Sequence, residues 1–179
     1  MDLSLANIWH CWQLFRRGKK DTREIDEFSY YLEANLLSLY HDLNDGSYQH
    51  AGYRTFIVTD NKRRHIAVAS IRDRVAHRLL YEYLVKIYDK TFIYDVWSCR
   101  KGKGVLGAIQ RAQKFLNKFN KSYAWRADIT KFFDNVDQAV LLDILNLKIK
   151  ETKPSRLLKQ VIDSYRFGSE VQERERERE

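Results

Sequence analysis

Residues 126–137 read RADITKFFDNVD, and this stretch carries the strongest indication of fold and chemistry in the sequence. Asp128 ends a β-rich run, SYAWRADI (122–129), and two phenylalanines and two more aspartates follow it. A carboxylate at the end of a strand is solvated, hydrogen-bonded or bound to a cation, because an isolated buried charge is too costly. These alternatives lead to different functions, and the flanking sequence has to distinguish between them.

The sequence before this stretch predicts helices and one β-hairpin. Apolar residues recur at helical spacing over 22–43, with Thr22 as the N-cap and Asn-Asp-Gly at 44–46 as the stop. Two β-rich runs, YRTFIVT (53–59) and HIAVA (65–69), flank a basic turn and predict a hairpin with a cationic tip. Further amphipathic helices are predicted over 72–88, over 105–119, after Asp137 and over 155–166, with a strand at 122–129.

The composition is that of a folded, basic chain of 179 residues. Hydrophobic residues make up 44%, and 32 Lys and Arg against 24 Asp and Glu give a net charge of +8. This charge favours an anionic partner, either nucleic acid or an anionic membrane surface. No apolar run approaches the roughly 20 residues that a membrane span needs, and the N-terminus lacks the features of a secretory signal. We therefore expect a cytoplasmic protein without a membrane partner, in which Cys11 and Cys99 are ordinary buried or half-buried thiols.

Three basic clusters punctuate the chain, at 16–20, 62–64 and 100–104. Any one of them could be a solvated loop. The second and third lie at predicted turns, where side chains and backbone N–H groups can converge on phosphate. Together with Asp128 as a metal ligand they suit nucleotidyl transfer, in which Mg²⁺ takes oxygen ligands and cations stabilise the triphosphate charge.

Three runs match a known family in order and spacing: RRHIAVASIRDRVAHRLLYEYLVKIYDKTF (63–92), WSCRKGKGVLGAIQRAQ (97–113) and ADITKFFDNVDQ (127–138). They resemble the N-terminal half of bacterial reverse transcriptases, in particular those of diversity-generating retroelements and group II introns. The resemblance covers roughly residues 10–165, and three ordered motifs are far more specific than any single one. It implies part of an RNA-directed DNA polymerase, encoded by a bacterium or phage, that binds an RNA template, a DNA or RNA primer and dNTP.

The resemblance implies an incomplete right-hand polymerase of the α+β class, made of fingers helices, a fingers hairpin and the first palm strand or strands. It divides the chain into an N-terminal helical segment (1–45), fingers (46–121), the beginning of the palm (122–170) and a charged tail (171–179). The tail reads VQERERERE, has no apolar face and is expected to be disordered. The palm strand is expected to keep a bare edge, which lowers stability.

The family match also implies roles for individual residues. Asp128 matches the first catalytic aspartate, and with the main-chain carbonyl of Ile129 it is expected to hold Mg²⁺ or Mn²⁺. Phe133 matches the aromatic residue that excludes a ribose 2′-hydroxyl and so selects dNTP. Lys62 and Arg64 on the hairpin are expected to contact the triphosphate of the incoming nucleotide. Contacts to nucleic acid are expected from Arg63, Arg72, Arg74, Arg100, Lys101 and Lys103, and Asp73 lies in the same motif as Arg72 and Arg74.

The sequence departs from the family at one point, because it contains no Asp-Asp pair and hence no Y-x-D-D motif. One catalytic carboxylate cannot hold two Mg²⁺ ions, so we expect nucleic-acid binding without primer extension, and metal binding only in the complete enzyme. The partner that this requires is a polypeptide carrying the rest of the palm and the thumb. Two other classes stay open: a non-catalytic nucleic-acid-binding module derived from a reverse transcriptase, and a structural helical domain whose charge only confers solubility.

Other polar residues are expected to be structural. Asp137 is predicted to cap the next helix, and Asp134 either to order the turn before it or to support the nucleotide pocket. His65 and His77 lack partners at ligand spacing, and we expect them at the surface or in the core. A core position is expected for Phe132, and the helical stripe of Trp9, Trp12 and Phe15 is expected to serve packing and not base stacking.

Overall fold

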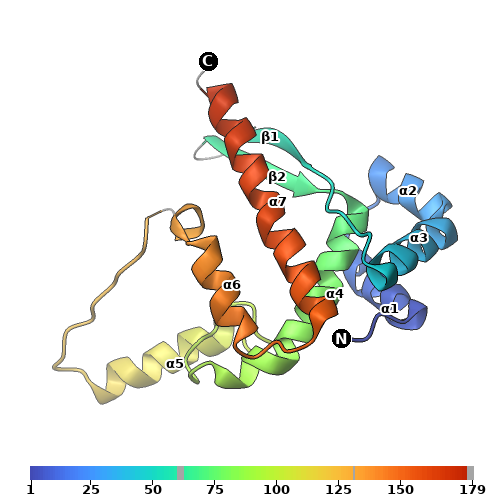
Figure 1. Cartoon of the computed structure of the whole chain (residues 1–179). Helices are drawn as coiled ribbons and strands as arrows, with labels where there is room; N and C mark the ends of the chain where they lie inside the picture. The colour runs from blue at the N-terminus through green and yellow to red at the C-terminus, as the bar shows by residue number, and fades with distance from the viewer. Residues whose placement is uncertain (60–62, 131, 177–179) are drawn as a thin grey trace. The chain divides into compact units, whose positions relative to one another are not determined.

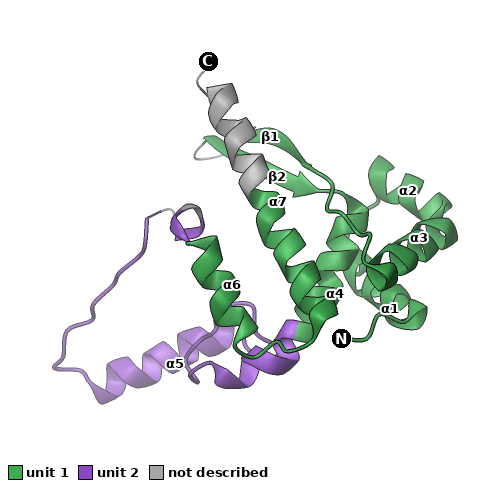
Figure 2. Cartoon of the chain, in the orientation of Figure 1, with its two compact units in different colours: residues 1–83, 137–179 green, residues 84–136 purple. Residues whose placement is uncertain are grey.

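The computed structural model describes residues 1–59, 63–130 and 132–176, and the side chains of Asp134 and of residues 166–176 lie outside that description. The described residues form an α+β structure with seven α-helices and a two-stranded antiparallel sheet, so the predicted fold class is confirmed at that level (Figure 1). The chain divides into a first unit, residues 1–83 with 137–179, and a second unit, residues 84–136 (Figure 2). The division into segments at 45, 121 and 170 stays a prediction.

Three helices open the first unit: α1 (Leu5–Arg16), α2 (Arg23–Tyr30) and α3 (Leu32–Asp45). The single helix predicted over 22–43 is therefore broken at Tyr31. Asn35 Nδ2 donates to the carbonyl of Phe28, at 3.0 Å, and so satisfies one acceptor that the break leaves free. The two predicted ends are confirmed, because the Thr22 side chain accepts from the Ile25 N–H and Gly46 ends α3 with a φ of 84°.

The core of the first unit includes the contact between α1 and α3. Trp12 and Phe15 are buried as predicted, and Trp12 also contacts Phe28 with ring centroids 5.0 Å apart. Trp9, the third member of the predicted stripe, is 45% exposed. The apolar residues that are fully enclosed or nearly so include Ile8, Cys11, Leu39, Val75, Ala76 and Leu79.

The predicted hairpin is confirmed as β1 (Tyr53–Thr59) and β2 (Arg63–Ala69), whose register pairs Tyr53 with Ala69 and Thr59 with Arg63. The tip between the strands, which contains Lys62, lies outside the described residues. After β2 the chain turns directly into α4 (Ile71–Tyr88), as the apolar spacing predicted. Ser70 caps α4, since its Oγ accepts from the Asp73 N–H at 3.1 Å.

Two C-terminal helices complete the first unit, α6 (Gln138–Asn146) and α7 (Thr152–Arg176). Asp137 caps α6 as predicted, and its carboxylate accepts from the N–H groups of Ala139 and Val140. α7 extends beyond the predicted 155–166, so residues 171–176 are helical where disorder was expected. Glu, Gln and Arg are strong helix formers, and an established helix can continue through them without an apolar face. Residues 177–179 lie outside the described part.

The second unit contains a turn of 3₁₀ helix, η1 (Asp89–Thr91), the predicted helix α5 (Val105–Lys118) and a second short turn, η2 (Phe132–Asn135). Residues 122–129 form no strand, so the predicted palm strand is wrong. A strand needs a neighbour to satisfy its N–H and C=O groups, and among the described residues β1 and β2 pair only with each other. Cys99 is exposed, against expectation.

Candidate nucleic-acid interface

Arg100, predicted to contact nucleic acid, anchors the loop of the second unit that contains it. Its Nε and Nη2 donate to the two carboxylate oxygens of Asp89 at 2.8 and 3.2 Å, and Nη1 donates to the carbonyl of Ile93 at 3.2 Å. The side chain is only 13% exposed. The Arg100 guanidinium lowers the pKa of the Asp89 carboxyl below its ordinary value, so the pair stays charged. These donors are occupied, and the structure therefore gives Arg100 a positioning role within the loop.

Lys103 also folds back on its own loop. Its Nζ lies 3.8 Å from the ring centroid of Tyr94 and 4.6 Å from that of Trp97, and it donates to the Tyr94 carbonyl. Trp97 packs against Gly107, where a Cβ would approach a ring carbon to 2.7 Å. Lys101, at the turn between Arg100 and Lys103, is exposed, and no partner for it is found among the described residues. Lys101 is thus the cation of this loop best placed to meet a phosphate.

Asp128 lies in an exposed, extended segment between α5 and η2. Ile129 is exposed beside it, and Phe133 on η2 contacts Phe132 edge to face at a centroid distance of 5.4 Å. Phe132 is also exposed, so its predicted core position is wrong. Within the described part of the chain no three His, Cys, Asp or Glu side chains are arranged to hold a metal ion. Asp128 and the carbonyl of Ile129 could therefore supply only part of a metal shell.

The predicted cations of the first unit fall into two groups. Arg63 and Arg64 are exposed on β2, opposite Thr59 and Val58, whereas Lys62 lies outside the described residues. Arg72 and Arg74 on α4 are engaged in packing. Arg72 pairs with Asp42 of α3 and lies over the Tyr48 ring, and the Arg74 guanidinium lies 4.7 Å from the ring centroid of Phe15 in α1.

The predicted site residues thus belong to two separate units. The hairpin cations are in the first unit, and Asp128, Ile129, Phe133 and the loop cations are in the second. A single cleft shared by both sets stays a prediction. The candidates that are exposed are Arg63, Arg64, Lys101, Asp128, Ile129 and Phe133. Those that are only partly exposed, and that contact groups of their own unit, are Arg72, Arg74, Arg100 and Lys103.

A buried polar cluster in the first unit was not found from the sequence. The carboxylate of Asp73, a residue only 1% exposed, accepts from Tyr48 Oη and Ser70 Oγ, both at 2.7 Å, and from the Ala51 N–H at 3.2 Å. Beside it, His50 Nε2 lies 2.9 Å from His77 Nε2. Ser70, three residues before Asp73 at the start of α4, was a readable capping signal. Nothing in the sequence links His50 to His77.

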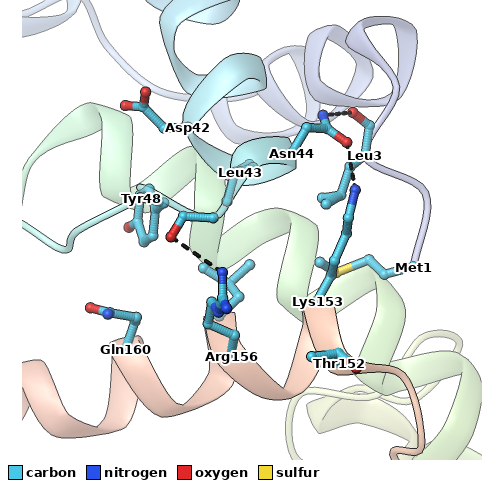
Figure 3. A pocket seen from close by; sticks show the side chains of 12 residues that line it. Met1, Leu3, Asp42, Leu43, Asn44, Tyr48, Thr152, Lys153, Arg156 and Gln160 are labelled. Carbon is cyan, nitrogen blue, oxygen red and sulfur yellow. Dashed lines mark hydrogen bonds between the residues drawn. The ribbon is translucent and has the colours of Figure 1, made fainter.

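A cavity of about 260 Å³ lies in the first unit between the end of α3 and the start of α7 (Figure 3). Lys153 Nζ donates to Asn44 Oδ1 at 3.0 Å, and Arg156 Nη1 donates to the Gly46 carbonyl at 3.4 Å. Both cations therefore join α7 to α3, and none of the predicted site residues lines this cavity.

Among the described residues there is no helix with the length and apolar character that a membrane crossing requires. Neither a protein-family model nor a curated protein matches this chain.

Proposed function

We propose that this chain is the fingers and the beginning of the palm of an RNA-directed DNA polymerase, and that it binds template–primer nucleic acid and dNTP. Catalysis with Mg²⁺ or Mn²⁺ then requires a further polypeptide that supplies the remaining carboxylates. The three ordered motifs support the family, and the uncovered apolar side of α5 is the observation that supports the missing partner.

α5 has the composition of a helix that packs on one side, yet none of its residues is buried. Val105 is 78%, Leu106 70% and Leu116 62% exposed. An amphipathic helix normally buries its apolar side, and contiguous exposed apolar surface marks an interaction site. The extended segment 122–129 has backbone groups that can pair with an added strand. A polypeptide with palm strands would cover the apolar side of α5 and pair with the backbone of 122–129.

In the proposed complete enzyme, Asp128 and the Ile129 carbonyl contribute oxygen ligands to the metal site, and Mg²⁺ suits such ligands. Bound there, such ions would supply Lewis-acid activation of the primer 3′-hydroxyl and charge stabilisation for the leaving pyrophosphate. Arg64, with Lys62, neutralises the triphosphate, and Phe133 screens the sugar. Arg63 and Lys101 are the exposed cations that would contact the phosphates of the nucleic acid. The remaining cations stabilise the structure around them: Arg72 and Arg74 on α4, and Arg100 and Lys103 in the loop at 100–104.

Binding is tested by fluorescence anisotropy of a labelled RNA–DNA template–primer at several salt concentrations. We expect affinity to fall linearly on a log–log plot as salt rises, because phosphate contacts release counterions. The double variant Arg63→Gln/Arg64→Gln should bind at least about three-fold more weakly. Arg54→Gln is the control, because Arg54 lies on the same hairpin, pairs with Glu24 at 2.9 Å and has no proposed contact to nucleic acid. Equal binding by both variants would contradict the proposed hairpin contact.

The polymerase assignment is tested separately by primer extension. The chain alone with Mg²⁺ should extend no primer, and a second polypeptide carrying a Y-x-D-D palm segment and thumb of this polymerase class should restore extension. Restored extension should be lost in Asp128→Asn.

The alternative is a non-catalytic nucleic-acid-binding module, for which the net charge of +8 and the exposed cations Arg64 and Lys101 suffice. Salt-dependent RNA binding that is unchanged in Asp128→Ala, with no extension after complementation, would select this alternative over the polymerase.

A further inference from the structure

The base of the hairpin is tied to α4 by a buried polar cluster that takes no part in the proposed nucleic-acid contacts. His50 lies in the connection between α3 and β1, and His77 lies on α4. The side chains of His50 and Asp73 are each only 1% exposed. The two imidazole rings stack with centroids 5.0 Å apart, and their Nε2 atoms face each other at 2.9 Å.

The protons in this contact can be assigned from its other partners. His50 Nδ1 hydrogen-bonds to the carbonyl of Ala51, and a carbonyl only accepts, so Nδ1 carries the proton. The neutral His50 ring must then accept at Nε2. His77 Nε2–H is accordingly the donor between the rings. The contact therefore requires that at least one of the two facing nitrogens be without a proton.

The charged and titratable groups around the pair come from every element that packs there. On α4, the Asp73 carboxylate has an oxygen 3.9 Å from His50 Nδ1, and Arg74 adds positive charge near His77. Tyr53 of β1 stacks on His50 and hydrogen-bonds to Ser164 of α7. Tyr165 of α7 contacts the ring of Tyr53. Tyr48 donates a hydrogen bond to Asp73. Arg72 lies over the Tyr48 ring and pairs with Asp42 of α3.

We propose that His50 and His77 form an acid-sensitive latch that holds the base of the hairpin against α4. One added proton on the pair can be accommodated, because one of the two facing Nε2 atoms can still donate to the other. A second proton places N–H against N–H and one imidazolium against another. The connection carrying His50 and the first residues of β1 then separate from α4. The hairpin that carries Arg63 and Arg64 loses its fixed base.

Burial, with the neighbouring His50 as the next cause, lowers the pKa of His77 to about 4. The second proton therefore enters only in acid, well below the ordinary pKa of a histidine.

The latch is tested in the full chain by two measurements. NMR titration of the histidine rings should give His77 a midpoint well below that of His65, which is exposed on the same hairpin. Hydrogen–deuterium exchange should show protection of β1 and β2 falling by about ten-fold, relative to α1 and α3, between about pH 7 and about pH 4.

The variant His77→Gln keeps an N–H donor for His50 Nε2 but cannot titrate, so hairpin protection should no longer depend on pH. His65→Gln, which removes a histidine without touching the cluster, should behave like the wild-type chain. A His77 midpoint equal to that of His65 would overturn the proposal, and so would an equal acid loss of hairpin protection in His77→Gln. If His77→Gln does not fold, the wild-type titration and exchange decide the question.

Discussion

Tyr48 and Asp73 form a buried hydrogen bond in the first unit. Burial and the adjacent Asp73 carboxylate both raise the pKa of Tyr48 above its ordinary value, so the hydroxyl stays protonated and remains a donor. Because Asp73 also accepts from Ser70 and the Ala51 N–H, removing one donor leaves a buried carboxylate partly unsatisfied.

We therefore expect Tyr48→Phe to lower the free energy of unfolding by about 1.5–3 kcal/mol. Urea denaturation near neutral pH measures the loss. Tyr30→Phe is the control, because Tyr30 is 81% exposed and should change stability very little. Equal effects of the two variants would count against a stabilising role for the Tyr48–Asp73 hydrogen bond.

Stability should also depend on pH through His77. Its pKa in the folded chain, about 4, lies below the ordinary value of 6.5, so the unfolded chain takes up the proton first as pH falls. The stabilising contribution is complete above about pH 6.5 and is lost as pH falls towards about 4. After allowance for the partial exposure of His77, we expect a loss of about 1–2 kcal/mol.

A series of urea denaturation curves measures this pH dependence. Four carboxyl groups also have lowered pKa values in the folded chain: Asp45, Asp89, Asp95 and Glu151. Their ordinary pKa values are 3.8 for Asp and 4.5 for Glu, so their contributions to stability are lost at lower pH than that of His77. A free energy of unfolding that stays constant from about pH 6.5 to about 4.5 would contradict the assignment to His77.

The histidine cluster also marks a limit of prediction from the sequence at the scale of residues. His77 was expected to be an ordinary surface or core residue, since no ligand stands at helical spacing from it. Its partner, His50, is 27 positions away and lies outside regular structure. Such a contact depends on how the connection between α3 and β1 folds over α4, which no local pattern encodes.

At the scale of elements, the junction of α3 and α7 depends on Gly46. Its φ of +84° is in the left-handed region, and a Cβ built there would lie 1.8 Å from Nη1 of Arg156. Gly46→Ala would strain the backbone and push Arg156 away from the Gly46 carbonyl to which it donates.

We expect Gly46→Ala to destabilise the chain by about 1–3 kcal/mol, the sum of the left-handed strain and one lost hydrogen bond. Gly18→Ala is the matched control, because its φ is +74° but nothing lies within 4 Å of the added Cβ. Thermal or urea unfolding should therefore show the larger loss for Gly46→Ala. Equal losses would mean that the Arg156 contact adds nothing.

The helices and the hairpin could be predicted because their signals are local. Thr22, Asp137 and Gly46 are caps that act within a few residues, and the spacing of apolar residues set α4 and α5. Residues 122–129 have the composition of a strand but not its structure, since a strand is completed by its neighbour. In the same way, a basic loop could be predicted at 100–104, but the ion pair between Arg100 and Asp89 could not.

At the scale of the whole molecule, the exposed segment around Asp128 should be the first site of proteolysis. Tyr123 and Trp125 in this segment are almost fully exposed, and the residues around them form neither helix nor strand. Proteases cut extended, exposed chain far faster than packed helices.

Brief digestion with trypsin should therefore cleave first after Lys121 or Arg126, as mass spectrometry of the fragments would establish. Cleavage after Arg72 or Arg74, which lie on the packed helix α4, should be much slower. Template–primer or a complementing polypeptide that covers this segment should slow the first cut. Initial cleavage within α4 would contradict the prediction that the segment around Asp128 is cut before the packed helices.

The first unit is discontinuous in sequence, and this determines when it can fold. Gly46 and Arg156, which join α3 to α7, are 110 positions apart. Contacts of such long range form late and slow folding, and during synthesis α7 leaves the ribosome only after the entire second unit has done so. The end of α3 therefore stays exposed on the nascent chain until α7 has been synthesised. We expect chaperones to bind this surface during translation.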